Sequence, residues 1–375
     1  MVAGLVVSSK YFTTKPFAYL LLYILVLLVN VFLGDIHYKT PRVVFNVTIE
    51  ILLPILITYG ILTSNTQKIL KVTVDCVLYM IIINAVCSFI IDMTMLGSIR
   101  SIHGTIRETG DNTIALTFYK LGLANYIMPH ALPCIIPILI IGIKVIKDKF
   151  TKWFMIASLI ACLLLVYLSG ATTPVLTAMI AVALGLFTNR KTGAKQLITL
   201  GVLFVLMYVI VTSEDIMLPL LRNLDNLMNN QGYFHSKIIE FENLIVYGET
   251  SGDMEQREDL YMTTWNAIIS NPIFGVDSEI GGHSFLLDRW GALGLIGVIP
   301  FLCFLFSQVK MFAKKISSAY FFYYYEGFFL TLLMLALKNV AGWESWLFLF
   351  TVLPLLTIYI ERMGVNKKWY KNNYK

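Results

Sequence analysis

The amino-acid sequence predicts an all-α fold, a polytopic membrane helical bundle of about ten transmembrane helices with one large, partly helical outer loop. Three observations predict it. Hydrophobic residues make up 57% of the 375 residues and charged residues only 14%, whereas soluble proteins average about a quarter charged residues. The apolar residues gather in runs of roughly the 20 residues that a helix needs to cross a hydrocarbon core. A single long hydrophilic stretch, from about Ser213 to Gly291, interrupts these runs.

Hydropathy predicts ten spans, and the basic residues between them predict which way each span runs. The predicted spans are residues 17–34, 43–63, 72–96, 122–143, 153–170, 172–188, 197–213, 291–309, 321–338 and 344–360. If the N-terminus is cytoplasmic, the inner connections carry 19 of the 29 basic residues, as the positive-inside rule requires. We therefore expect a multi-pass membrane protein with both termini in the cytoplasm.

The predicted organisation has three parts. Residues 1–213 hold seven spans with short loops, residues 214–290 form the large outer loop, and residues 291–375 hold three spans and a basic cytoplasmic tail.

The Lys and Arg are dispersed between apolar segments, so we expect no nucleic-acid partner. The five cysteines lie inside apolar runs without metal-site spacing. No Gly-rich phosphate loop is present, and we expect no cofactor.

Two helices are predicted within the outer loop. From Leu218 to Asn230, apolar residues recur at helical three- and four-residue spacing, opposite polar residues that include Arg222. This pattern is typical of an amphipathic helix at a membrane surface. A second helix is predicted from about Asp253 to Ser270, with Asp253 able to cap it. Pro272 ends this helix, because the residue before a proline is driven out of the helical region.

The residues that follow the second helix carry a resemblance to a known family. They comprise the turn Asn271-Pro272-Ile273-Phe274-Gly275, the glycine-rich turn Gly281-Gly282-His283-Ser284, and the run from Phe285 to Gly297. Together with Arg257 and Tyr261 upstream, this pattern resembles the outer-loop signature of the O-antigen ligase and polymerase family of bacterial envelope glycosyltransferases. The resemblance is strongest over about residues 257–297.

Two further segments bear on the same resemblance. The stretch from Gly122 to Tyr126 is similar to the corresponding region of capsular polysaccharide polymerases. The stretch from Ser169 to Pro174 lacks the arginine that the family often carries between two middle spans. This departure weakens the case for a substrate contact at that turn.

The resemblance implies a metal-independent glycosyltransferase of the bacterial cytoplasmic membrane. In the family, a glycan joined through its reducing end to undecaprenyl pyrophosphate moves to an acceptor hydroxyl on the outer face, and the lipid pyrophosphate leaves. Because of the stretch Gly122 to Tyr126, the leading interpretation is polymerisation of lipid-linked oligosaccharide repeats into a surface polysaccharide, O-antigen or capsule. A ligase that transfers the lipid-linked glycan to another acceptor is the nearest alternative. A transporter is a third, disfavoured because no internal repeat is visible.

The implied partners follow from that reaction. They are the undecaprenyl-pyrophosphate-linked oligosaccharide and membrane lipids, with a flippase and a chain-length regulator as candidate protein partners. Such a reaction needs cations for the leaving diphosphate and a group that takes a proton from the acceptor.

Candidate site residues come from the motif positions. His283 resembles the family's essential loop histidine, and a histidine can accept a proton near neutral pH. Arg257 resembles the loop arginine, whose planar fork suits phosphate oxygens. The further candidates for binding the diphosphate or glycan are Arg222, Arg100, Arg107 and Tyr261. The competing interpretation makes each arginine a solvated loop charge and His283 a turn residue that caps backbone groups. We expect no metal site, because the outer loops offer no cluster of carboxylates or histidines at ligand spacing.

Overall fold

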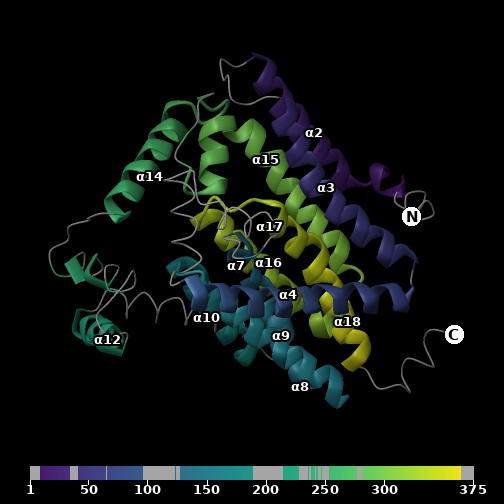
Figure 1. The fold of residues 1–375 in the computed structure, drawn as a ribbon. Coiled ribbons are helices and arrows are strands. Elements are labelled where there is room, and N and C mark those ends of the chain that lie inside the picture. The colour runs from purple at the N-terminus through teal and green to yellow at the C-terminus, as the bar shows by residue number, and fades with distance from the viewer. Residues whose placement is uncertain are drawn as a thin grey trace.

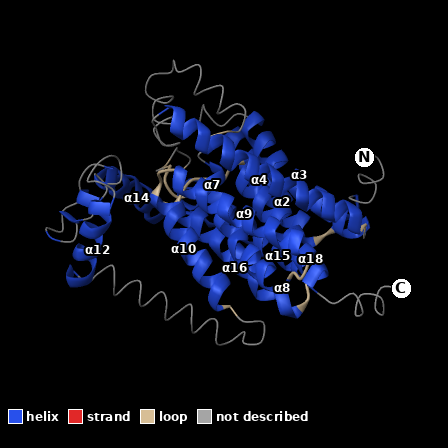
Figure 2. Cartoon of the chain, turned by 60° about the horizontal axis from the view of Figure 1, so that its bottom comes forward, coloured by secondary structure: helices blue, strands red, loops and turns tan. Residues whose placement is uncertain are grey.

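In the computed structural model, every regular element among the described residues is a helix (Figure 2). The structure describes residues 9–33, 41–64, 66–95, 123, 127–188, 214–227, 235, 238–240, 242–243, 246, 253–276, 280 and 282–364. The predicted all-α polytopic bundle is confirmed.

The helices follow the predicted spans closely. In chain order they are η1 (Ser9–Thr13), α2 (Lys15–Leu33), α3 (Pro41–Ser64), α4 (Gln67–Met95), α7 (Ile127–Ala131), η2 (Leu132–Ile135), α8 (Ile136–Val145), α9 (Lys149–Leu168), α10 (Thr172–Phe187), α12 (Glu214–Leu227), α14 (Asp253–Ser270), α15 (Phe285–Ala313), α16 (Ser318–Leu337), α17 (Trp343–Leu347), η3 (Phe348–Val352) and α18 (Leu353–Gly364).

Among the described residues, eight helical segments are long and apolar enough to cross a membrane. They coincide with eight of the ten predicted spans. The sixth predicted span is α10, an apolar helix of 16 residues that is shorter than the other eight. The seventh predicted span, residues 197–213, lies outside the described residues.

The core of the bundle is formed by its last helices together with the segment Ile127–Val145, which is 78% buried. The segment Trp343–Met363 is 83% buried, whereas the first span is only 22% buried. This contrast places α17 and α18 at the centre and α2 at the periphery, where its apolar side chains can face lipid. Helix α15 runs alongside α2 (Figure 1), and the rings of Tyr23 and Phe301 lie 5.0 Å apart between them.

Prolines break the regular helices inside this core. The segment from Ile127 to Val145 passes through the 3-10 turn η2, which begins just before Pro133. The π-helical turn η3 directly precedes α18, whose second residue is Pro354. A proline has no N–H to donate to the preceding turn, so the backbone changes its hydrogen-bond register there.

The two outer-loop helices lie beside the bundle (Figure 1). Helix α14 has the predicted bounds, Asp253 to Ser270. Helix α12 begins at Glu214 and ends at Leu227, whereas the sequence predicts residues 218–230. The earlier start brings two acidic residues, Glu214 and Asp215, into the first turn, where the helix dipole favours negative charge.

Helix α15 begins at Phe285, six residues before the start at Gly291 that hydropathy predicts. Charged residues at positions 288 and 289 lower the average hydropathy, so hydropathy alone does not detect the first part of this helix. Its N-terminus is capped by Ser284, whose hydroxyl oxygen accepts a hydrogen bond from the N–H of Leu287 at 3.2 Å. A sharp bend at Gly294, where φ is 61° and ψ is −171°, separates the first part from the rest of the helix.

Candidate functional site

His283 lies in the turn that leads into α15. The preceding residue, Gly282, has a φ of +86°, a conformation that favours glycine. The following residue, Ser284, is fully buried as the cap of α15. The imidazole itself is partly exposed and meets the ring of Tyr261 edge to face, with 6.2 Å between ring centroids and 89° between ring planes.

Three helices meet at this histidine. Tyr261, on α14, donates a hydrogen bond from its hydroxyl to the backbone carbonyl of Leu337 at the end of α16, at 3.0 Å. The N–H of Phe285, the first residue of α15, donates to the carbonyl of Lys338 at 3.3 Å. The imidazole is therefore placed between α14 and the beginning of α15, and both are tied to the end of α16.

Side-chain contacts hold α14 against the first part of α15. The hydroxyl of Thr264, which is almost fully buried, donates to the carboxylate of Asp288 at 3.0 Å. The indole N–H of Trp290 donates to the carbonyl of Pro272 at 3.3 Å. These contacts set the position of α14 along α15.

The turn from Asn271 to Gly275 is joined to the bend of α15 by backbone hydrogen bonds. The N–H groups of Leu295 and Ile296 donate to the carbonyls of Pro272 and Ile273, at 2.9 and 3.2 Å. The N–H of Val276 donates to the carbonyl of Gly291 at 3.0 Å.

Two glycines make this close approach possible. Gly275 and Gly294 both have positive φ. A Cβ atom on Gly294 would lie 2.1 Å from the carbonyl oxygen of Ile273, and one on Gly275 would lie 2.3 Å from that of Ala292. The Asn-Pro-x-x-Gly motif therefore has a structural role: it locks the end of α14 into the bend of α15.

Arg257 belongs to α14, four residues before Tyr261. Residues four apart on an α-helix are neighbours on one face, so the backbone puts the position of Arg257 one turn from the tyrosine that contacts His283. The arginine side chain is outside the described part of the chain. The register of α14 is thus compatible with the prediction that Arg257 and His283 belong to one site.

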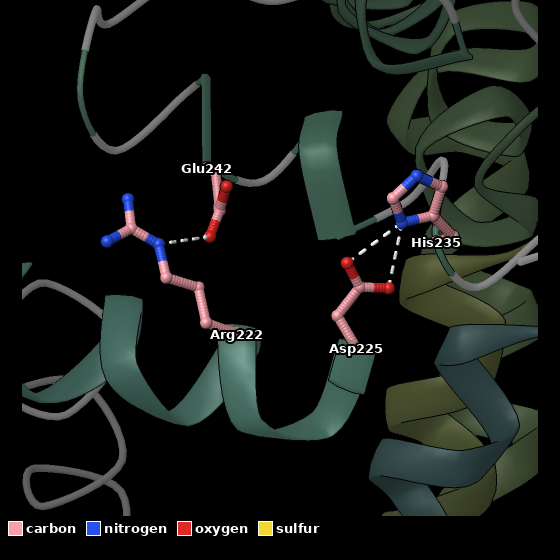
Figure 3. Close-up of polar contacts among 4 residues, drawn as sticks. All are labelled: Arg222, Asp225, His235 and Glu242. Carbon is pink, nitrogen blue, oxygen red and sulfur yellow. Dashed lines mark hydrogen bonds and ion pairs between the residues drawn. The ribbon is translucent and has the colours of Figure 1, made fainter. Parts of the chain in front are cut away.

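Arg222 has a different environment. Its Nε donates to the Glu242 carboxylate at 3.1 Å, and its side chain is 66% exposed (Figure 3). One turn further along α12, both oxygens of Asp225 lie 2.8 Å from Nδ1 of His235. These two pairs fasten the following segment to α12. The contacts described for Arg222 do not include a residue of the His283 site, and its diphosphate role stays a prediction.

Arg100 and Arg107 lie outside the described residues, as does all of the stretch Gly122 to Tyr126 except Leu123. The structure therefore brings together His283 and Tyr261, and it places the position of Arg257 beside them. The roles of Arg100 and Arg107 stay predictions.

Three residues of this arrangement were not predicted from the sequence. Lys338 joins the site because the end of α16 packs against the turn at His283, and no local pattern signals that contact. Ser284 and Asp288 did have a signal. A serine before an apolar run with an acidic residue in the first turn is a typical helix start, and this pattern could have predicted the start of α15 at Phe285.

Comparison with known proteins identifies a related family. A family profile described as O-antigen ligase matches residues 157–282. The match begins within α9, includes α12 and α14, and ends at the residue before His283. No curated protein matches the chain.

Proposed function

Since the chain belongs to the O-antigen ligase/polymerase family, we propose that it polymerises undecaprenyl-pyrophosphate-linked oligosaccharide repeats into a surface polysaccharide. It acts as a glycosyltransferase at the outer face of the bacterial cytoplasmic membrane. The placement of His283 carries this proposal. A partly exposed imidazole lies at the start of a membrane helix and contacts Tyr261 of α14. Tyr261 and Phe285 in turn donate hydrogen bonds to the end of α16. A positioned histidine of this kind suits proton transfer near neutral pH.

The proposed step has a simple balance. The acceptor oxygen bonds to the anomeric carbon of the donor glycan. The bond between that carbon and the phosphate oxygen breaks, and its electron pair leaves with the lipid pyrophosphate. The proton of the acceptor hydroxyl passes to the imidazole of His283. Arg257 binds the leaving diphosphate, because its guanidinium keeps its charge and matches phosphate oxygens bidentately.

The proposed role of Tyr261 differs from a direct substrate contact. Its hydroxyl donates to the carbonyl of Leu337 and its ring packs on His283. We propose that Tyr261 positions the imidazole. Arg222, Arg100 and Arg107 remain proposed diphosphate ligands from the neighbouring outer segments, and the arginines take the part that a metal ion plays elsewhere.

Purified full-length protein tests the reaction directly. In EDTA, with a lipid-linked repeat as the only substrate, it should release lipid pyrophosphate and build a ladder of longer lipid-linked chains. Extension that strictly requires added Mg²⁺ or Mn²⁺ would contradict the metal-independent mechanism. Failure to extend under either condition would contradict the polymerase assignment.

A ligase is the second candidate, because the matching family profile is described as O-antigen ligase. A deletion strain separates the two functions. Single repeats on the lipid carrier indicate a polymerase, and long unattached lipid-linked chains indicate a ligase. Repeats that stay in the cytoplasm would instead point to a transporter.

A further inference from the structure

An apolar patch lies on the exposed side of α14 and its following turn. It consists of Met262, Trp265, Ile269, Ile273 and Phe274, whose side chains are 51% to 68% exposed. The first three recur at three- and four-residue spacing, so they share one face of the helix. Contiguous exposed apolar surface of this kind marks a site of contact with a membrane or another protein.

The patch is separate from the face by which α14 packs on the protein. Among the side chains of α14 that the structure describes, Thr264 and Ile268 are buried, at 2% and 4% exposure. Thr264 bonds to Asp288 of α15. Helix α14 thus has one apolar side covered by α15 and another that no described residue buries. Its charged residues are concentrated at the other end, between Asp253 and Asp259.

The hydrogen bonds between the turn after α14 and helix α15 indicate how deep the patch lies in the membrane. The carbonyls of Pro272 and Ile273 accept from the N–H groups of Leu295 and Ile296. From Leu295, 19 residues of helix remain before α15 ends at Ala313. At 1.5 Å per residue they extend about 28 Å, close to the roughly 30 Å hydrocarbon core. The turn therefore lies at the level where α15 enters the hydrocarbon.

The patch continues the lipid-facing surface of α15. Beyond the bend, Ile296 and Ile299 are 43% and 53% exposed on this membrane-spanning helix. Side chains exposed there must face acyl chains. Ile273 is bonded through its carbonyl to Ile296, so the exposed side chains of Ile273 and Phe274 extend the same apolar surface. Figure 1 shows α14 beside the first part of α15, at the end of the bundle where α15 bends.

We propose that the patch contacts the acyl chains of the outer leaflet, which makes α14 an interfacial helix. Trp265 suits this position because tryptophan favours the boundary between headgroups and hydrocarbon. One consequence rests on the proposed function. The row of Arg257 and Tyr261 flanks the patch on α14, so a diphosphate carried on a lipid would reach the site at headgroup height.

Photo-crosslinking tests this contact without relying on enzymatic activity. A diazirine-bearing amino acid is placed singly at 265 or 269 of the full chain, in vesicles of phosphatidylethanolamine and phosphatidylglycerol. After illumination, mass spectrometry should find phospholipid adducts at both positions. The matched controls are the exposed polar neighbours Asn266 and Ser270, where water adducts should dominate.

Each other outcome would overturn the proposal. Water adducts at 265 and 269 would place the patch in solvent. Cross-links to a second copy, or to another segment of the same chain, would replace lipid by that partner. Because the readout is an adduct mass, its failure would leave the proposed transferase reaction standing. Loss of activity in the assay with the lipid-linked repeat would, in turn, leave the lipid contact standing.

Discussion

At the scale of single residues, the proposed chemistry depends on the contact between His283 and Tyr261. The edge-to-face packing of their rings and the hydrogen bond from Tyr261 to Leu337 fix the imidazole relative to two helices. A catalytic base must be held within hydrogen-bond reach of the proton it accepts. Rigid placement by packed helices meets that need better than a free loop would.

Replacement of His283 by alanine should reduce the transfer rate by about 10²–10⁴, the usual contribution of a positioned base. Binding of the lipid-linked donor should persist, because it depends on the arginines. The rate should also fall on acidification, since only the neutral imidazole accepts a proton. Rates come from the purified protein and the lipid-linked repeat.

His283→Gln is the control for a purely structural role. Glutamine can make hydrogen bonds to the same backbone groups but cannot act as the base. Normal chain lengths from His283→Gln, or a flat rate across about pH 5.5 to 8, would remove His283 from the chemistry.

Arg257→Lys should lose most activity while the protein still inserts and accumulates. Lysine keeps the charge but lacks the planar fork that binds two phosphate oxygens. For comparison, Arg222→Lys should lose less activity, because Arg222 is also a proposed diphosphate ligand but its Nε already bonds to Glu242. Polymer length in cells and protein level in membranes are the two measurements. Full polymer output from Arg257→Lys would exclude this residue from the diphosphate site.

Tyr261→Phe separates positioning from substrate contact. The variant removes the hydrogen bond to Leu337 but keeps the ring against His283. Such a bond contributes about 0.5–1.5 kcal/mol, so we expect a modest loss in kcat with an unchanged KM for the lipid-linked donor. Tyr261→Ala should lose far more kcat. A rise in KM with kcat unchanged would instead identify a substrate contact.

At the scale of elements, the joint between α14 and α15 organises the outer site. The backbone bonds from Leu295 and Ile296 hold the turn after α14 at the bend of α15. Gly275 and Gly294 allow the two backbones to approach this closely. Packing therefore explains the glycines Gly275 and Gly294 of this stretch, and the joint places two of the predicted site residues, Tyr261 and His283, in contact.

Gly294→Ala should destabilise the protein more than Gly282→Ala. Both positions have positive φ, at 61° and 86°, so both alanines carry a backbone strain of roughly 1–2 kcal/mol. At Gly294 the new Cβ collides with the carbonyl of Ile273. At Gly282 the new Cβ has no heavy atom within 4 Å beyond the adjacent residues. Thermal unfolding in detergent measures the difference. Equal shifts in Tm for the two variants would argue against the joint.

At the scale of the whole molecule, the bundle separates an inner side from an outer side. The connections between α8 and α9 and between α15 and α16 are rich in lysine, including Lys147 and Lys315. Helix α14 lies in the long connection on the opposite side of the predicted topology. The positive-inside rule predicts that the lysine-rich connections lie in the cytoplasm.

Cysteine labelling in intact cells tests this orientation. Cysteines introduced at Lys147 and Lys315 should resist an impermeant maleimide, and one at Thr263 on the exposed side of α14 should react. The parent chain with its five native cysteines supplies the background signal. Labelling at Lys147 from outside would invert the predicted topology.

The fold class, most spans and the bounds of α14 could be predicted from the sequence alone. These features depend on local signals: hydrophobic runs of membrane length, apolar periodicity, and Pro272 as a helix stop. Such signals can be recognised in the sequence because each acts within a few turns of helix.

The contacts between residues of different helices could be identified only from the tertiary structure. Tyr261 bonds to Leu337, 76 positions away, and the carbonyl of Lys338 accepts a hydrogen bond from the N–H of Phe285, two residues after His283. The lock between Gly275 and Gly294, the early start of α15 and the pairing of Arg222 with Glu242 are further examples. The physical reason is that these contacts form between helices, where packing and backbone approach select partners that no periodicity within one helix encodes.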